Sequence, residues 1–179
     1  MELDEAIDFL QTDTLSATFT PLGLKYLSLR HRRGEEQINL REYIGKKQRN
    51  PRINLLISET LRFLNTGSHA MPLDLTAFTD FQQRVFEAVS RVEPGIVTTY
   101  KGIAEKLGSP GAAQAVGSAV AKNPVSYFLP THRVLPQRGI GICRTGAGYL
   151  REKLLEHEGH DLTRLRGNYL CTRKKCLLE

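Results

Sequence analysis

The sequence predicts an α+β protein in which a mixed α/β domain precedes a helical domain. Apolar and polar residues alternate over residues 16–33, which is typical of strands, whereas apolar residues recur at helical spacing from residue 79 onward. Charge changes with this pattern, since residues 1–79 hold 10 basic and 10 acidic side chains and residues 80–179 hold 15 and 9. The predicted organisation is an N-terminal domain at 1–76, a second domain at 77–160 and a basic tail at 161–179.

The bulk composition is that of a soluble globular protein. The chain has 179 residues, of which 40% are hydrophobic. It contains no run of about 18 apolar residues, the length that spans a bilayer. Its first residues, "MELDEAIDF", are acidic where a signal peptide would be basic and then apolar. We expect an intracellular protein, cytoplasmic or nuclear, with no membrane partner.

The three cysteines indicate neither a disulfide framework nor a metal site. Cys143, Cys171 and Cys176 are odd in number and lack a framework spacing. The Cys-x4-Cys pair in the tail is wider than the usual zinc clip and has no second ligand pair. We therefore expect free thiols, with no metal and no cofactor.

The first domain reads as a short helix, a hairpin and a longer helix. Residues 4–11 fit the short helix, and the alternating stretch at 16–33 turns at Pro21-Leu22-Gly23. Residues 53–67 carry apolar side chains at helical spacing and end at Gly67, a residue that commonly closes helices. Residues 70–79 then break the pattern and form the expected linker.

The second domain opens with a capped amphipathic helix. Thr79 is followed three residues later by Gln82, a capping-box signature, and the apolar stripe that follows stops at Pro94-Gly95. This spacing predicts a helix of roughly 12 residues. The helix would pack its apolar stripe on the core of the second domain.

Two further helices around a short turn predict a helix-turn-helix. Residues 98–108 form a short helix closed by Gly108, after which Ser109 can cap and Pro110 can begin a helix at 110–123. A turn of only a few residues between such helices is typical of this DNA-binding arrangement. The positive charge of this half fits a polyanionic partner, although a solvated basic surface is an equally simple interpretation.

The third helix of this domain is built from unusually small side chains. Such residues allow a helix backbone to approach another surface closely, which would suit a DNA groove. The same residues suit a tightly packed helix pair, and the spacing leaves both interpretations open. The small side chains are Ala112, Ala113, Ala115, Gly117, Ser118 and Ala119.

The string "TTYKGIAEKLGSPGAAQAVGSAVAKNPVSYFLPTHRV", followed by "LLEHEG", resembles the O6-alkylguanine-DNA alkyltransferases. That family has Asn-Pro, Pro-Cys-His-Arg-Val and a closing Glu-Gly in this order, and the resemblance extends from about Thr18 to Gly159. It implies a ribonuclease-H-like N-terminal domain and a winged-helix-like C-terminal domain. In the family, the recognition helix enters the minor groove of double-stranded DNA and the alkylated guanine is flipped into a pocket.

The resemblance places Thr131 where the family has its acceptor cysteine. Displacement at an alkyl carbon needs a strong nucleophile, and a thiol with a pKa near ~8.5 becomes a thiolate with modest help. A threonine hydroxyl is much harder to ionise and works as a nucleophile mainly beside a dedicated base. We therefore expect self-alkylation by this loop to be lost or nearly lost.

The other members of the family's reactive site are present. The resemblance makes His132 the base, Glu158 the carboxylate that orients it, and Asn123 the residue that braces the loop by hydrogen bonding. Simpler interpretations stay open, because a histidine beside an arginine is usually solvated and Glu158 could serve only in ion pairs.

Several residues match DNA-contacting positions of the family. Tyr100 matches a tyrosine that crowds the target phosphate, while Gln114 replaces the arginine finger that fills the gap left by a flipped base. We expect weaker flipping from glutamine, since it lacks the charge and some of the reach. The remaining predicted contacts are Ala112, Ala113, Gly117 and Arg133.

The predicted alkylguanine pocket departs from the family pattern. Arg144 stands where the family has a guanine-contacting tyrosine, which suggests altered ligand preference. Cys143 precedes it and is a conceivable relocated acceptor, although a chance loop cysteine is the simpler interpretation. The predicted pocket residues are Val134, Cys143, Arg144 and Thr145.

Three functions follow from these departures. The leading one is a monomeric DNA-binding protein that recognises O6-alkylguanine without self-alkylation and marks it for a repair-pathway protein, as alkyltransferase-like proteins do. The alternative is an active methyltransferase that uses Cys143, or one whose natural cysteine was replaced by engineering. A third is a DNA-binding relic without lesion specificity, favoured by the loss of both the cysteine and the arginine.

Overall fold

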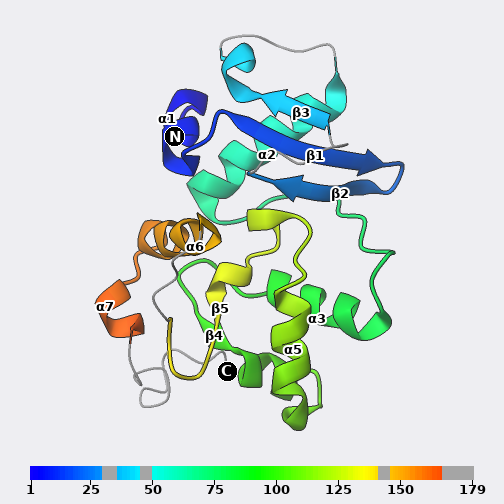
Figure 1. Cartoon of the computed structure of the whole chain (residues 1–179), viewed down its shortest axis with the longest axis vertical. Helices are drawn as coiled ribbons and strands as arrows, with labels where there is room; N and C mark the ends of the chain where they lie inside the picture. Colours follow the sequence, from blue (N-terminus) through cyan, green and yellow to red (C-terminus); the bar gives the residue numbers. More distant parts are fainter. Residues whose placement is uncertain (30–35, 45–49, 141–145, 167–179) are drawn as a thin grey trace. The chain divides into compact units, whose positions relative to one another are not determined.

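The computed structural model describes residues 1–29, 36–44, 50–140 and 146–166, which form two compact units (Figure 1). The first unit comprises Met1–Ala77 together with Pro124–Phe128, and the second comprises Phe78–Asn123 with Leu129–Glu179. The mixed helix and sheet content agrees with the predicted class. The boundaries at 76/77 and 160/161 stay predictions, and the sequence did not indicate that a later segment groups with the first unit.

The first unit contains a three-stranded antiparallel sheet in the order β2-β1-β3. The predicted hairpin is confirmed as β1 (Thr14–Thr20) and β2 (Gly23–Ser28), whereas β3 (Glu36–Asn39) was not predicted. Gly23 has a φ of +145°, and a Cβ there would lie 2.3 Å from the carbonyl oxygen of Pro72. This position therefore requires glycine, because the backbone after the turn hydrogen-bonds directly to that carbonyl.

Two α-helices complete the first unit. The amphipathic α1 (Leu3–Leu10) buries Ala6, Ile7 and Leu10. The longer α2 (Pro51–Thr66) begins two residues before its predicted start, because Asn50 caps it and proline suits the first helical position. It ends at Gly67 in the left-handed conformation, as predicted. A short 3-10 turn, η1 (Leu40–Tyr43), precedes it.

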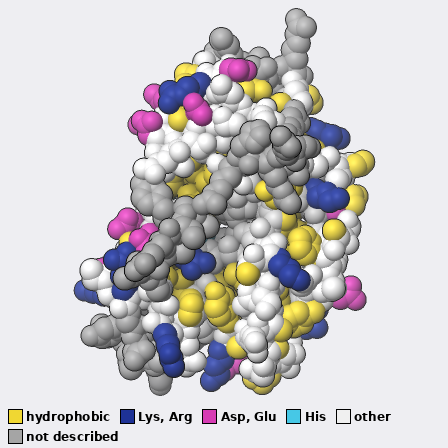
Figure 2. Space-filling view, viewed as in Figure 1, with side chains coloured by type: hydrophobic (Ala, Val, Ile, Leu, Met, Phe, Trp, Pro, Cys, Tyr) yellow, Lys and Arg dark blue, Asp and Glu magenta, His cyan; other side chains and the backbone are white. Residues whose placement is uncertain are grey.

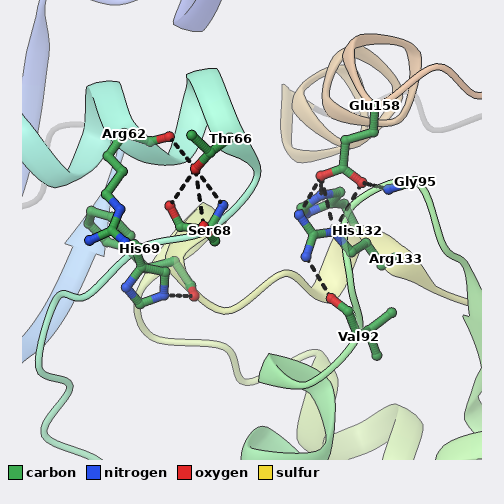
Figure 3. A network of polar contacts seen from close by, with 10 residues as sticks. Arg62, Thr66, Ser68, His69, Val92, Gly95, His132, Arg133 and Glu158 are labelled. Atoms are coloured by element: carbon green, nitrogen blue, oxygen red, sulfur yellow. Dashed lines mark hydrogen bonds and ion pairs between the residues drawn. The ribbon is translucent and has the colours of Figure 1, made fainter.

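Residues Pro124–Phe128 are tied into the first unit by buried polar contacts. The backbone nitrogen of Leu27 donates to the carbonyl oxygen of Pro124 over 2.8 Å. The hydroxyls of Thr60 and Tyr127 lie 2.9 Å apart. His69 Nε2 lies 2.6 Å from the carbonyl oxygen of Phe128, the last residue of the segment. Figure 3 shows this histidine near the end of α2. The segment, which includes the turn η3 (Ser126–Phe128), is thus an integral part of this unit.

The second unit is built on α3 (Asp80–Ser90), whose predicted capping box is present. Thr79 Oγ1 accepts from the backbone nitrogen of Gln82 over 3.4 Å, and the Gln82 side chain accepts from the backbone nitrogen of Thr79 over 3.2 Å. The helix presents its apolar stripe to a core of buried side chains. That core includes Val85, Val89, Ile103, Val116, Val120 and Val134.

The predicted pair of helices is confirmed, with a different start to the second one. The first is α4 (Tyr100–Lys106), after which Gly108 takes a φ of +69°. The chain then makes a 3-10 turn, η2 (Pro110–Ala112), and continues as α5 (Ala113–Val120). Ser109 was expected to cap, but its side chain makes no capping hydrogen bond. The helix that follows the turn is therefore shorter than predicted.

A two-stranded parallel sheet and two more helices complete the second unit. The strands are β4 (Thr98–Thr99) and β5 (Val134–Leu135), which pair in register. After them come α6 (Gly146–His157) and α7 (Leu162–Leu165). A small second core gathers between these elements and includes Val97, Leu135, Ile140, Leu155 and Leu165. None of the helices that the structure describes is long and apolar enough to cross a membrane.

Candidate active-site turn

Thr131 lies at the start of a 3-10 turn, η4 (Thr131–Arg133), that leads directly into β5. The backbone nitrogen of Thr131 donates to the carbonyl oxygen of Leu129 over 2.6 Å. The backbone nitrogen of Arg133 donates to the carbonyl oxygen of Pro130 over 3.0 Å. Because β5 is paired with β4 on the other side, the turn is fixed at both ends. Thr131 itself is only partly buried.

Asn123, three residues beyond α5, braces this turn. Its side-chain amide nitrogen donates to the carbonyl oxygen of Leu129 over 3.1 Å and to Thr131 Oγ1 over 3.0 Å. One amide thus holds both the backbone before the turn and the side chain at the acceptor position. The hydrogen bonding predicted for this residue is present.

Glu158, one residue beyond α6, joins the turn through a buried network (Figure 3). His132 Nε2 lies 2.9 Å from Glu158 Oε1, and Arg133 Nε lies 3.0 Å from each carboxylate oxygen. Arg133 Nη2 approaches Oε1 to 2.6 Å, while Nη1 donates to the carbonyl oxygen of Val92 over 2.6 Å. The backbone nitrogen of Gly95 donates to Glu158 Oε2 over 3.4 Å. The carboxylate therefore accepts from a histidine, an arginine and a backbone amide.

Burial governs the protonation of this network. The side chains of His132, Arg133 and Glu158 are only 4%, 2% and 6% exposed. Desolvation would raise the pKa of Glu158, but hydrogen bonds from His132 and Arg133 outweigh it and lower that pKa to about 2. Desolvation lowers the pKa of His132, and its hydrogen bond to Glu158 offsets only part of this effect. The network thus holds an ionised carboxylate beside a histidine that favours its neutral form.

The structure corrects two expectations about this network. Arg133 was predicted to contact DNA, but its guanidinium is buried and committed to Glu158 and Val92. The interpretation of His132 as a solvated histidine is wrong, because the ring is buried. Glu158 forms an ion pair with Arg133, and its contact with His132 leaves the orienting role a prediction. No sequence pattern indicated the roles of Val92 and Gly95, apart from the turn signal at Pro94-Gly95.

The predicted recognition helix α5 exposes one face and buries the other. Gln114, Ala115 and Ser118 are exposed, whereas Ala112 and Ala113 are half-buried. A Cβ built on Gly117 would lie 3.6 Å from the ring of Tyr100, which is ordinary contact. Gly117 thus packs against α4, as the helix-pair interpretation expects, and the exposed small residues leave entry into a DNA groove a prediction.

Of the predicted pocket residues, the structure describes only Val134. Val134 is buried in β5, directly after the Thr131–Arg133 turn, and belongs to the core of the second unit. Cys143, Arg144 and Thr145 lie outside the described residues, as do Cys171 and Cys176. Within residues 1–29, 36–44, 50–140 and 146–166, no group of histidine, cysteine or acidic side chains is arranged to hold a metal ion.

Residues 80–160 match the family described as "6-O-methylguanine DNA methyltransferase, DNA binding domain". This match takes in Asn123, the whole Thr131–Arg133 turn and Glu158. The DNA-binding domain of this methyltransferase family is therefore recognisable in residues 80–160 of the chain.

Similar curated proteins carry one name. The methylated-DNA–protein-cysteine methyltransferase of Shigella flexneri is 41% identical over 85 residues, covering 48% of this chain and 50% of the relative. The protein of that name from Mycobacterium leprae is 42% identical over 93 residues, covering 52% and 56%. The chain therefore spans about half the length of these methyltransferase relatives.

Solved structures of the methyltransferase family resemble more of the chain. The Mycobacterium tuberculosis O6-methylguanine methyltransferase is 28% identical, with a TM-score of 0.60 over 83% of this chain and 96% of that one. The Mycobacterium tuberculosis OGT in complex with DNA is also 28% identical, with a TM-score of 0.60 over 80% and 85%. The similarity of fold thus extends into both units of this chain.

Proposed function

We propose that this protein binds duplex DNA and recognises O6-alkylguanine without accepting the alkyl group. The observation that carries the proposal is the combination of a braced turn with a hydroxyl at its first residue. Asn123 holds Thr131, and Glu158 holds the two residues after it. The site keeps its supporting hydrogen bonds while the family's nucleophile is absent. A protein of this kind would act inside the cell, as a monomer, and pass the lesion to a repair-pathway protein.

The chemistry of transfer explains why Thr131 disfavours the reaction. The acceptor must form a bond to the alkyl carbon as the bond from that carbon to guanine O6 breaks, and it must first lose its proton. The hydrogen bond from Asn123 to Thr131 Oγ1 is a donation, so it does not supply a base for the hydroxyl proton. His132 Nε2 is directed to Glu158 rather than to the hydroxyl. Among the contacts of Thr131 that the described residues make, the hydroxyl thus has no direct partner acting as a base, which threonine nucleophiles require.

Binding is proposed to use α5 and the start of α4. The outward face of α5 carries Gln114 together with Ala115 and Ser118, and the small size of the latter two would let the helix enter a groove. Gln114 would fill the gap left by a flipped guanine, and Tyr100 would crowd the phosphate beside it. A similar protein was solved in complex with DNA, which supports DNA as the partner. We propose the finer descriptions, ribonuclease-H-like for the first unit and winged-helix-like for the second, on the same basis.

One observation favours a second candidate. The similar curated proteins are named methyltransferases, so an acceptor elsewhere in this chain would make it an enzyme. Cys143, whose placement lies outside the described residues, is the cysteine nearest to the turn in sequence. The natural protein would also be an enzyme if position 131 held a cysteine that was replaced by engineering.

A paired measurement tests the proposal. The protein is mixed with otherwise identical duplexes that contain guanine or O6-methylguanine, the latter with a radiolabelled methyl group. Fluorescence anisotropy gives the two affinities, and protein-bound label gives the transfer. We expect tighter binding of the lesion duplex and no bound label. Bound label that disappears in a Cys143→Ser variant would instead establish the enzyme, and equal affinities for both duplexes would leave a relic without lesion recognition.

A further inference from the structure

A hollow of about 410 Å³ lies between the exposed side of α3 and the end of α4, within the second unit. It is distinct from the Thr131 turn, because none of the residues that line it takes part in the network around Glu158. Arg84 and Glu87 lie on successive turns of α3, Arg91 directly follows that helix, and Lys106 is the last residue of α4. The residues that line it are Arg84, Glu87, Ala88, Arg91, Lys106 and Leu107.

Three cations and one carboxylate face this hollow, so its lining carries an excess of positive charge. Arg84 Nη2 donates to the carbonyl oxygen of Leu107 over 3.1 Å, which fixes this guanidinium at the end of α4 and leaves its other N–H groups for a ligand. Among the residues that the structure describes, Lys106 has no hydrogen-bond or ion-pair partner. On the face drawn in Figure 2, Lys and Arg side chains are spread among hydrophobic and other side chains. In the hollow, by contrast, three cations line one site.

The acidic residue in the hollow does not cancel this charge firmly. Glu87 Oε1 lies 2.7 Å from Arg91 Nη2, but these two side chains are 61% and 73% exposed. An exposed ion pair of this type contributes only about 0–1 kcal/mol and is screened by salt. An anion could therefore replace Glu87 as the partner of Arg91 at little cost.

We propose that this hollow, lined by Arg84, Arg91 and Lys106, binds a phosphate group of the DNA backbone. The inference rests on the proposed function, because it assumes that duplex DNA lies against α5. In helix-turn-helix proteins the second helix enters the groove while the first crosses the sugar-phosphate backbone. Here the first helix is α4, and Lys106 ends it immediately before the turn that leads into α5.

Position favours a DNA phosphate over an acidic peptide as the ligand. Gln114 lies in the first turn of α5, so the strand next to an opened base pair would run past the turn η2. The end of α4 immediately precedes that turn in the chain. Contacts of this kind fix the register of a protein on its duplex and carry no sequence information. The hollow is thus assigned a positioning role that does not depend on the lesion.

Salt dependence of binding provides the test. The affinity of the full chain for a plain duplex and for an O6-methylguanine duplex is measured over a range of salt concentrations. Each phosphate neutralised contributes about 0.9 to the slope of log K against log salt. Because three cations share one phosphate, we expect Lys106→Gln and Arg91→Gln each to lower that slope by no more than about 0.9, equally for both duplexes. Arg52→Gln, which removes an exposed charge from the first unit, is the matched control and should leave the slope unchanged.

Glu87→Gln gives a change of the opposite sign. Removing the competing carboxylate frees Arg91 for the phosphate, so affinity for both duplexes should rise. A slope for Lys106→Gln equal to that of Arg52→Gln would overturn the proposal. The proposal would also fail if the hollow bound a polyglutamate peptide while the substitutions left the salt slope of DNA binding unchanged. The partner would then be an acidic protein. Failure of the unaltered chain to bind either duplex would instead refute the proposed function.

Discussion

The side-chain amide of Asn123 lies 3.0 Å from Thr131 Oγ1 and 3.1 Å from the carbonyl oxygen of Leu129. A single side chain therefore links the end of α5, the approach to the turn and the position where the family has its acceptor. The amide donates to any acceptor atom placed at residue 131, whether oxygen or sulfur. The brace is thus compatible with either a binding protein or a transferase, and residue 131 decides between them.

Thr131→Cys is expected to restore alkyl transfer. A thiol ionises far more readily than a hydroxyl, and sulfur is the stronger nucleophile toward carbon. Intact-mass measurement after incubation with an O6-methylguanine duplex should show one methyl group replacing one hydrogen. Thr131→Ser, which keeps the hydroxyl and removes only the methyl branch, is the control and should gain nothing. Methyl uptake by the unaltered protein would contradict the whole assignment.

Asn123→Ala is expected to loosen the turn more than Thr131→Val does. The alanine variant removes the bonds to Thr131 Oγ1 and to the carbonyl oxygen of Leu129, which keeps only the backbone donor of Thr131, and each lost bond costs about 0.5–1.5 kcal/mol. The valine variant keeps the shape of threonine and loses only the side-chain bond. Hydrogen exchange of peptides from residues 123–135 measures the difference. Equal protection in both variants would show that the bond to Leu129 contributes nothing.

Glu158→Gln is expected to destabilise the second unit by about 3–5 kcal/mol, because it leaves the buried charge of Arg133 without its counter-ion. The double variant with Arg133→Met should recover part of this loss, since both charges are then absent. Glu87→Gln, which breaks an exposed pair, is the control and should cost less than about 1 kcal/mol. Urea unfolding followed by circular dichroism suits the chain, which has no tryptophan. A double variant less stable than the single one would count against this account.

Acid is expected to destabilise the protein through His132. Its pKa in the folded protein lies below the ordinary value of 6.5, so the unfolded chain binds more protons as the pH falls below about that value. Stability should therefore decrease as the pH falls from about 7.5 to 5.5. The pKa of Glu158 is lowered from 4.5 to about 2, so its contribution is lost only in stronger acid.

Comparison with His132→Gln isolates this effect. His160, whose pKa is also lowered by burial, remains in both proteins and cancels in the comparison. The melting temperature of the variant should vary less between these two pH values than that of the unaltered protein. Parallel pH profiles would show that His132 does not titrate in this window.

Gln114→Arg is expected to strengthen binding to an O6-methylguanine duplex. Gln114 is exposed in the first turn of α5, and an arginine there adds reach and a positive charge. Gln114→Ala should weaken lesion binding, because alanine can neither fill the gap nor hydrogen-bond to the orphaned base. Anisotropy titrations with lesion and plain duplexes measure both changes. An arginine variant that gains equally on both duplexes would indicate a simple charge effect instead of an inserted finger.

The sequence predicted the parts of the fold that local signals control. Thr79 and Gln82 mark the start of α3, and glycines 67 and 108 mark helix ends because each adopts a left-handed conformation there. The strand β3 was missed because it has only four residues and is mostly polar, so its pairing with β1 leaves no local pattern. The grouping of Pro124–Phe128 with the first unit was also missed. It depends on partners such as Leu27 and His69, which are distant in sequence.

Site prediction failed where burial decided the role of a charge. Arg133 stands in a basic stretch and was assigned to DNA, yet its partner Glu158 lies 25 residues away and holds it inside the protein. The hollow between α3 and α4 was not predicted either. Arg84 and Lys106 are 22 residues apart, and only the packing of two helices brings them to one place. Spacing within one helix carries no information of this kind.

The polypeptide passes between its two units three times, at residues 77/78, 123/124 and 128/129. A truncated protein that starts at residue 78 would therefore keep Tyr127 and Phe128 while losing the side chains that cover them. These two rings are 1% and 0% exposed in the intact chain, and uncovering them would favour self-association. Deletion of residues 1–77 thus leaves the segment Pro124–Phe128 without the side chains that bury it. A fragment produced by a single cut is therefore expected to be insoluble.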